Sequence, residues 1–242
     1  MDNSVREWAQ EVVAQCVSSV MRSRRAVRAF RLQPLDRRVV EDILEDAAAA
    51  PSGANIQPWR VYVVAGALKD ELANALLTAS RSGTMPAPAH FPDPLPEVFR
   101  NRLQDFGARY YASLDIDRTD AAARGRQSEK NLSFFGAPVG LIFTIDRRLK
   151  PHSWIDLGMF AQNVMLAAKA RGVDTCPQVS FAPFHDVIAA HLRMAPEEVT
   201  AFGMSMGYGD PRAPVNQVAM PRERVRDFAT IVGFERSAEH DA

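Results

Sequence analysis

The sequence predicts an α+β fold built as a single domain over residues 1–242. Apolar residues recur at helical spacing in several segments, whereas other segments carry the β-branched and aromatic residues that are typical of strands. A chain of this length can bury one sizeable core. It contains no internal repeat and no segment with the composition of a domain linker, so we expect its elements to share that core.

The N-terminal part of the chain predicts helices on either side of a strand. Residues 4–22 place apolar side chains at helical spacing and predict an amphipathic helix. Asp36 is suited to cap a second helix, which Pro51 ends. The run 59–64 is rich in β-branched and aromatic residues and predicts a strand. The leucine spacing of residues 68–79 then predicts a third helix.

An excursion is predicted over residues 84–115. Residues 84–96 contain five prolines, which remove backbone donors and prevent a helix from continuing. A helix is expected over 99–110, and helical structure again over 117–133. A surface loop is the plainer interpretation of the proline-rich part, and a cover over a binding site is the alternative.

The C-terminal half predicts two further strands around a long helix. The near-continuous apolar run 138–146 is typical of a central strand. Ser153, with Asp156 three residues later, resembles a capping box, so the helix is expected to begin there, and Gly172 is well placed to end it. A short strand is predicted over 202–207.

The chain closes with an arm, residues 211–242. Prolines and charged residues dominate it until the apolar patch 228–234. An extended arm cannot bury such a patch by itself, so this patch needs a partner surface.

The composition excludes several classes of protein. Lysine plus arginine and aspartate plus glutamate each total 29, and this balance argues against a dedicated nucleic-acid binder. Cys16 and Cys176 form no CxxC pair and are consistent with a reduced, cytoplasmic protein. Neither a signal peptide nor an apolar run long enough to cross a membrane is visible. The five histidines lack the spacing of a metal site.

Two short segments carry the functional signal. Residues 24–28 place three arginines within five positions, and residues 51–59 form a loop of small and amide side chains that ends in an aromatic. Together they suit a ligand with a phosphate dianion at one end and a flat ring with polar edges at the other. FMN is a common ligand of that description. A GxGxxG signature is absent, so a nicotinamide cofactor is not expected to bind through a dinucleotide-binding fold.

These segments, with three others in the same order, resemble the nitroreductase family of FMN-dependent flavoproteins. The motifs are Arg24-Arg25-Ala26-Val27-Arg28, Pro51 to Trp59, Phe134 to Pro138, Asp156-Leu157-Gly158 with Gln162-Asn163, and Gly207 to Pro211 with Asn216 and Arg222. One departure is Ala26, because the family usually has serine there and one hydroxyl contact to the cofactor is then missing.

The resemblance implies a central mixed, mainly antiparallel sheet flanked by helices. It also implies a homodimer with two FMN sites at the subunit interface and C-terminal arms exchanged between subunits. NAD(P)H would reduce the flavin and then leave, and a nitroaromatic or quinone acceptor would take its place. Such ping-pong, two-electron chemistry carries a nitro group through nitroso to hydroxylamine.

The family's cofactor contacts carry over by position. Arg24 and Arg222 are expected to hold the FMN phosphate, with Arg25 beside the phosphate and the ribityl chain, and Arg28 is expected to face the pyrimidine edge of the flavin. Pro51, Ser52, Gly53 and Asn55 are expected to contact the flavin from the partner subunit. The backbone of Pro177, Gln178, Val179 and Ser180 is expected to lie by the hydride-accepting nitrogen. Ala26 completes the set, and no side-chain acid or base is required because the flavin carries the chemistry.

Aromatic residues of the excursion are expected to form a wall over the flavin face and to contact the acceptor. They are Phe91, Phe99, Phe106, Tyr110 and Tyr111.

Several alternatives stay open at this point. The scaffold also suits reductive dehalogenation, enoate reduction or hydrolytic denitration, or a flavin-binding module that is not catalytic. The motifs do not distinguish NADH from NADPH. Gly203-Met204-Ser205-Met206-Gly207 fits the GxSxG pattern of hydrolases, but Gly207, Gly209 and Pro211 exclude the helix that must follow such a serine. The only histidine after it is His240.

Overall fold

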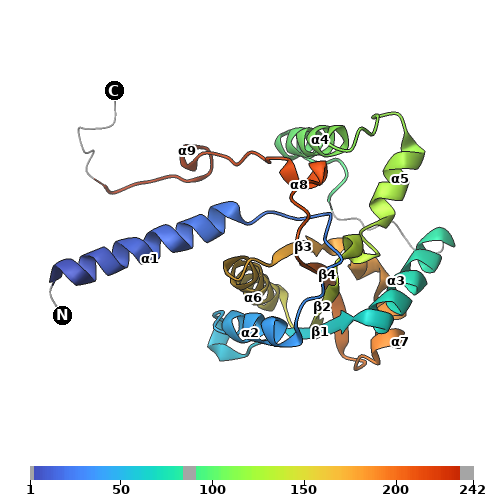
Figure 1. Ribbon diagram of the computed structural model, residues 1–242, viewed down its shortest axis with the longest axis horizontal. Helices are drawn as coiled ribbons and strands as arrows, with labels where there is room; N and C mark the ends of the chain where they lie inside the picture. Colours follow the sequence, from blue (N-terminus) through green and yellow to red (C-terminus); the bar gives the residue numbers. More distant parts are fainter. Residues whose placement is uncertain (1–2, 84–90, 235–242) are drawn as a thin grey trace.

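A computed structural model describes residues 3–83 and 91–234 of the chain. Within these residues, four strands form one antiparallel sheet in the order β1-β2-β4-β3. Figure 1 shows this sheet at the centre of the molecule. The strands are β1 (Arg60–Ala65), β2 (Val139–Asp146), β3 (Asp174–Gln178) and β4 (Glu198–Gly207).

Helices cover both faces of the sheet (Figure 1). One face carries α2 (Arg37–Ala47) and α6 (Pro151–Ala170), and the other carries α3 (Gly66–Arg81) and α7 (His185–Leu192). The alternation of β2 follows this arrangement, because successive side chains of a strand point to opposite faces. Leu141, Phe143 and Ile145 pack with α2 and α6, whereas Ile142 packs with α3 and α7.

The remaining helices extend away from this core (Figure 1). The long α1 (Asn3–Ser23) projects from the core. The helices α4 (Glu97–Ala112) and α5 (Ala121–Glu129) lie beyond the β3 edge of the sheet, away from α2. Two short helices, α8 (Pro214–Gln217) and α9 (Val225–Phe228), belong to the C-terminal arm. Single turns of 3-10 helix occur at η1 (Gly53–Asn55), η2 (Phe134–Gly136) and η3 (Val179–Phe184).

The predicted α+β fold is confirmed, and two caps are confirmed in detail. Asp36 caps α2 by accepting a hydrogen bond from the backbone N–H of Arg38. Gly172, at φ +71°, follows α6, and the N–H of Val173 donates to the carbonyl of Ala168 at 2.9 Å. A glycine in the left-handed region is the usual residue at this position, since it has no Cβ.

Other sequence-based predictions were wrong in part. The helix α6 begins at Pro151 after the N-cap Lys150, so Ser153 and Asp156 form no capping box. Proline is favoured in the first helical turn because its missing N–H would have no partner there. The predicted helix over 117–133 is limited to α5 and is followed by η2. The sheet is mainly antiparallel, as expected. Among the described residues, its parallel component is one isolated bridge, between Ala26 and Thr175.

One strand and one helix that pack in the core were not predicted from the sequence. The strand β3 has the sequence Asp-Thr-Cys-Pro-Gln, whose aspartate and proline disfavour strands. It lies at the edge of the sheet, where a proline removes no essential hydrogen bond. The helix α7 follows η3 after Pro183 and is only eight residues long.

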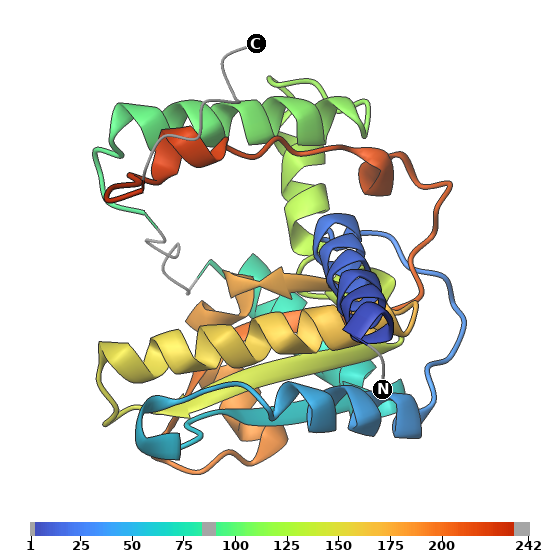
Figure 2. The ribbon, with the colours of Figure 1, turned by 90° about the vertical axis from the view of Figure 1, so that its left-hand side faces the viewer.

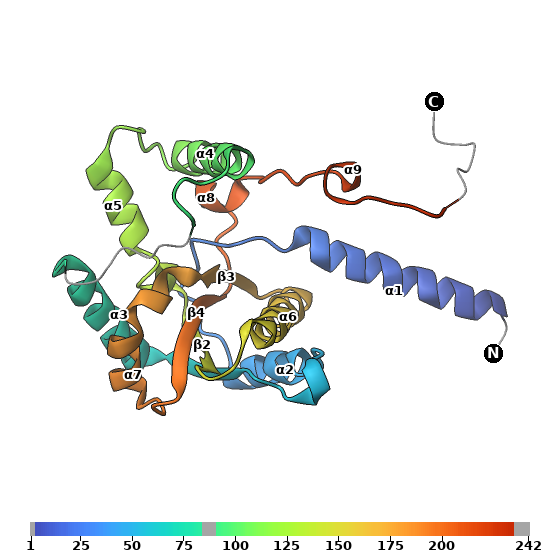
Figure 3. The ribbon, with the colours of Figure 1, turned by 180° about the vertical axis from the view of Figure 1, so that it is seen from behind.

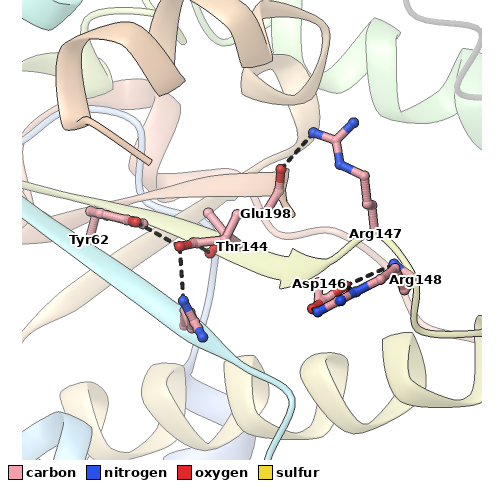
Figure 4. A network of polar contacts seen from close by, with 7 residues as sticks. Tyr62, Thr144, Asp146, Arg147, Arg148 and Glu198 are labelled. Carbon is pink, nitrogen blue, oxygen red and sulfur yellow. Dashed lines mark hydrogen bonds and ion pairs between the residues drawn. The ribbon is translucent and has the colours of Figure 1, made fainter. Parts of the chain in front are cut away.

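A buried carboxylate ties three strands together at one end of the sheet (Figure 4). Glu198 of β4 accepts hydrogen bonds from the Tyr62 hydroxyl at 2.9 Å, from Arg60 Nη1 at 3.1 Å and from the Thr144 hydroxyl at 2.5 Å. Burial raises the pKa of the Glu198 carboxyl, but hydrogen bonds from Thr144, Tyr62 and Arg60 outweigh it and hold the pKa below its usual value. No buried side-chain nitrogen or oxygen of this network lacks a hydrogen-bond partner, so we assign it a structural role.

Two glycines on the central strands make room for two phenylalanine rings. A Cβ at Gly140 of β2 would lie 2.4 Å from the ring of Phe134, and one at Gly203 of β4 would lie 2.4 Å from the ring of Phe181. The two rings contact each other at a centroid distance of 4.7 Å. This side of the core therefore has no space for a larger residue at either glycine.

We predict that Gly140→Ala lowers the free energy of unfolding by about 1–3 kcal/mol, the usual cost of overpacking a core. Chemical denaturation measures this loss. Gly125→Ala is the control, because a Cβ at Gly125 in α5 meets no atom within 4 Å and alanine favours a helix. Equal stability of Gly140→Ala and wild type would contradict the packing described here.

Candidate functional site

The arginine motif lies in an extended segment between α1 and α2, held along the edge of the sheet. Ala26 forms the parallel bridge with Thr175 of β3, and the N–H of Val27 donates to the carbonyl of Thr175 at 3.0 Å. Further along, the N–H of Arg31 donates to the carbonyl of Tyr208 at 2.8 Å. The motif is thus positioned by β3 and by the residues that follow β4.

Asn216 of α8 holds this segment by its side-chain amide. Its Oδ1 accepts from the N–H of Arg28 at 2.8 Å, and its Nδ2 donates to the carbonyls of Ala29 at 2.8 Å and Asp210 at 2.9 Å. Its own backbone carbonyl accepts from Arg25 Nη1 at 2.9 Å. Asn216 is buried, so these bonds replace those it would make with water.

The alternation of an extended chain separates the arginines into two groups. Arg24 and Arg28 both lie close enough to Cys176 to influence its thiol electrostatically. Arg25 faces the other way and lines a small cavity of about 220 Å³ with Val27 and Lys169. The side chain of Arg25 therefore lies on the other face of the segment from the side chain of Arg24, and the next residue, Ala26, forms the bridge to β3.

Arg24 and Arg222 form a pair of like charges. Burial lowers the pKa of the half-buried Arg24 guanidinium, and the nearby positive charge of Arg222 lowers it further. Among the residues that the structure describes, neither forms an ion pair, and Arg222 donates only to the carbonyls of Met220 and Pro221. Two cations without a carboxylate between them are suited to bind a dianion.

Arg28 lies against the aromatic face of α4. Its guanidinium carbon is 5.5 Å from the ring centroid of Phe106 and 5.1 Å from that of Tyr110. The Tyr110 hydroxyl accepts a hydrogen bond from Nε2 of the buried Gln127 at 2.8 Å. Burial raises the pKa of Tyr110, and the bond from Gln127 and the charge of Arg28 oppose this shift.

The end of β3 faces the arginines mainly through its backbone. Cys176 is buried, and burial raises its pKa to about 11, so it is an unreactive thiol near neutral pH. The Gln178 side chain points into the core, where Nε2 donates to the Asn131 carbonyl at 2.7 Å and Oε1 accepts from Ser205 at 2.5 Å. Pro177 and Val179 are exposed, and Ser180 is half-buried.

The same contact rules out the hydrolase pattern. Ser205 lies within β4, is fully buried and donates to Gln178, and no helix follows it directly. His240 lies outside the described residues. A nucleophilic serine needs an exposed hydroxyl on a turn that leads into a helix, so this alternative is wrong.

The loop Pro51–Asn55 follows α2 and lies away from the arginine segment, which precedes that helix, as Figure 2 shows. It packs against the start of α6, where the N–H of Gly53 donates to Asp156 at 3.2 Å, and Ser52 Oγ accepts from the N–H of Gln57 at 3.0 Å. Ala54, Asn55 and Gln57 have positive φ, which is uncommon for such residues and frequent at functional sites. Within one chain, the two motifs do not meet.

The predicted acceptor wall divides into three parts. Phe106 and Tyr110 contact Arg28, whereas Phe91 and Phe99 are about half exposed and do not. Tyr111 lines a cavity of about 860 Å³ between α4 and α5. Leu103, Phe106 and Gly107 of α4, residues 115–118, and Arg124 of α5 complete most of its wall.

Arg124 is a cation of this cavity that the sequence analysis missed. Its guanidinium carbon lies 4.6 Å over the Tyr111 ring, and its Nη1 donates to the Arg118 carbonyl at 3.1 Å. No ion pair of Arg124 occurs in the described ranges. Asp117 lines the same cavity, but its carboxylate accepts from the backbone and hydroxyl of Thr119. No periodicity in this polar segment distinguishes Arg124 from its neighbours.

Apolar residues gather on two projecting segments. Figure 3 shows α1 and the C-terminal arm extending from the same side of the core. The arm starts along α4, where Arg102 pairs with Glu223 at 2.9 Å. The exposed apolar residues of these segments are Trp8, Val13, Val17 and Met21 on α1, and Val225, Phe228, Ile231, Val232 and Phe234 on the arm.

The described part of the chain contains no group of three or more histidine, cysteine, aspartate or glutamate residues arranged to hold a metal. It also contains no helix both long and apolar enough to cross a membrane.

Comparisons with known proteins agree with this geometry. The model of the nitroreductase family matches residues 21–208. The 4-nitrobenzoate reductase of Pseudomonas putida is 44% identical, over 90% of this chain and 96% of its own. The nitrobenzene nitroreductase of Ectopseudomonas oleovorans is 41% identical, over 89% of this chain and 96% of its own.

Among solved structures, the FMN-dependent nitroreductase NfnB from Mycobacterium smegmatis in complex with NADPH superposes with a TM-score of 0.87. It is 33% identical, and the match covers 91% of this chain and 100% of that one. The fold, the order of the motifs and these similarities lead to one conclusion: the chain belongs to the nitroreductase family.

Proposed function

We propose that the protein is an FMN-dependent oxidoreductase that uses NAD(P)H to reduce nitroaromatic or quinone-type acceptors in two-electron, ping-pong steps. The observation that carries this proposal is the pair Arg24 and Arg222, two neighbouring cations with no carboxylate partner in the described part of the chain. The relatives add the reaction, because they are named as reductases of 4-nitrobenzoate and of nitrobenzene.

The residues fit FMN at both of its ends. A terminal phosphate dianion would neutralise Arg24 and Arg222, and this relieves the repulsion that lowers the Arg24 pKa. A flat ring system would reach Arg28, whose cation would stabilise negative charge at the pyrimidine edge. Residues 177–180 would border the ring through their backbone, since the Gln178 side-chain amide is already paired in the core.

Bound FMN supplies the acceptance and donation of a hydride equivalent. The residues of this chain would bind and orient it, and the two ionisable side chains nearest to Arg28, Cys176 and Tyr110, are unsuited to act as general bases near neutral pH. Cys176 stays protonated near neutral pH, and Tyr110 has a raised pKa. This arrangement supports a redox enzyme over a hydrolytic denitrase, which would need to activate water.

We further propose a cytoplasmic homodimer in which each flavin site combines both chains. The arginine segment is held by β3 and Asn216, whereas the loop Pro51–Asn55 is held by Asp156 of α6, at the far end of α2 (Figure 2). We therefore expect that one chain does not bring both to the same flavin. A second copy would supply the missing loop. It would also cover the exposed apolar residues of α1 and of the arm, whose exposure is unfavourable for a chain in isolation.

The function is tested by adding acceptors without oxygen. We predict that the purified protein is yellow and releases FMN on denaturation. Anaerobic NAD(P)H should bleach the flavin, and 4-nitrobenzoate should restore its absorbance as it is reduced to the nitroso compound. With excess NAD(P)H, a second two-electron cycle should yield the hydroxylamine, identified by mass spectrometry. A flavin that is bound but is not reduced by either nicotinamide would instead indicate a binding module without catalysis.

The phosphate site is tested by removing one cation at a time. Arg24→Ala and Arg222→Ala should each weaken FMN binding by about 1.5–3 kcal/mol, the range for hydrogen bonds to charged groups. Flavin fluorescence titration of the apoprotein measures this change. Arg226→Ala is the control, because Arg226 lies on the same arm, is exposed and contacts Asp227. An equal loss in all three variants would show a general effect of charge.

The dimer is tested on the exposed face of the arm. Ile231→Asp should weaken the dimer and lower the FMN content together, because both depend on the same interface. Leu32→Asp is the control, since Leu32 is 94% exposed and lies outside α1 and the arm. Analytical ultracentrifugation gives the mass. A flavin-loaded monomer would show that one chain completes the site.

The cavity between α4 and α5 favours an acceptor with an anionic substituent, because Arg124 has no acidic partner within the described residues. Arg124→Gln should raise KM for 4-nitrobenzoate about tenfold or more, the effect of losing one charge-assisted bond. KM for nitrobenzene should change much less. Arg126→Gln is the control, since Arg126 is exposed on the same helix and does not line the cavity. An equal rise for both acceptors would contradict a role in charge recognition.

A further inference from the structure

We propose that Phe106 and Tyr110 of α4 position the Arg28 guanidinium, so that FMN binding and the packing of α4 and α5 are energetically coupled. The inference deepens the proposed function, because it rests on Arg28 as the residue at the pyrimidine edge of the flavin. It assigns to these two aromatic residues a part in cofactor binding, in place of the acceptor contact that their sequence position predicts.

The contacts of Arg28 show that the rings are its main support. The guanidinium carbon lies 5.5 Å from the centroid of Phe106 and 5.1 Å from that of Tyr110. Its other side-chain contact in the described part of the chain is a long hydrogen bond of 3.5 Å from Nη1 to the Ala26 carbonyl. Its backbone N–H is held by Asn216, but that bond does not orient the side chain.

Aromatic rings can orient a cation without neutralising it. A carboxylate would use the N–H donors of the guanidinium and cancel its charge, whereas a ring attracts it through the negative face of its π system. The five donors of an arginine lie in the guanidinium plane, so stacking leaves them available. Arg28 therefore keeps both its charge and most of its donors for an anionic or carbonyl-rich ligand edge.

The rings are themselves held by α5. Tyr110 is 7% exposed, and its hydroxyl accepts from Nε2 of Gln127, which is 4% exposed. The Phe106 ring stacks on Tyr110 at 5.5 Å. A chain of contacts thus runs from Gln127 of α5 through Tyr110 and Phe106 of α4 to the cofactor motif.

Coupling of this kind acts in both directions. A ligand that restrains Arg28 also stabilises the position of α4, and rings that restrain Arg28 also favour the ligand. Tyr111 offers a matched comparison. It lies next to Tyr110 on the same helix and meets the edge of that ring at 5.1 Å, but the cation on its own face is Arg124, at 4.6 Å, and not Arg28.

The test is FMN titration of the full-length apoprotein, followed by flavin fluorescence. Phe106→Leu and Tyr110→Leu should weaken FMN binding roughly three- to tenfold, the range expected for a partly buried cation–π contact. Tyr111→Leu should have a much smaller effect, because its ring touches Tyr110 but not Arg28. In an Arg28→Gln background, Phe106→Leu should cause no further loss, because the contact has already been removed.

A second measurement leaves both rings in place. In Arg28→Gln apoprotein, amide hydrogen exchange should accelerate in α4 and α5 but not in α2 or α6. This exchange measurement uses neither ring variant. It therefore tests the coupling even if circular dichroism shows that a ring variant fails to fold.

Three outcomes would overturn the inference: equal loss in Tyr111→Leu, the same loss from Phe106→Leu with and without Arg28, or unchanged exchange in α4 and α5. Failure of the wild-type chain to bind FMN would instead overturn the proposed function, and the exchange experiment would still decide whether Arg28 and α4 are coupled.

Discussion

The site depends on how the side-chain amide of Asn216 holds the extended segment after α1. An extended segment at a sheet edge has few contacts, yet this one must place Arg24 and Arg28 within a few ångströms of their partners. Asn216 accepts from the N–H of Arg28 and donates to the carbonyls of Ala29 and Asp210. Its bonds join the N-terminal segment to the residues after β4, so the motif and the closing segment form one structural unit.

The positive charge gathered by this unit is not balanced by acidic residues in the part of the chain that the structure describes. Burial lowers the pKa of Arg24, and repulsion from the nearby Arg222 lowers it further. Arg28 is surrounded by aromatic rings instead of carboxylates. Such an arrangement destabilises the chain by itself and becomes favourable when an anion binds. It contrasts with the Glu198 network, where the buried carboxylate accepts three hydrogen bonds, one of them from a cation, and the role is structural.

The cofactor motif contacts α4, and α4 contacts α5, so these helices are part of the binding site and not a separate cover over it. Phe106 borders the cavity that holds Arg124 and also contacts Arg28. The charge proposed to face the cofactor and the charge proposed to face the acceptor therefore both lie against aromatic residues of α4, Arg28 against Phe106 and Tyr110 and Arg124 against Tyr111. Changes at Phe106 are expected to affect both binding events.

The sequence by itself determined the α+β class, the central strand β2 and the identities of the charged residues. These follow from periodicity and from local chemistry, which act over a few neighbouring residues. Only the tertiary structure decided that Asp174–Gln178 forms a strand, since its pairing with β4 outweighs the poor propensity of its aspartate and proline. Only it separated Arg25 from Arg24, because alternation matters once the segment lies along β3. It also brought Tyr110 to Arg28, a contact between residues 82 positions apart in sequence, which no local pattern records.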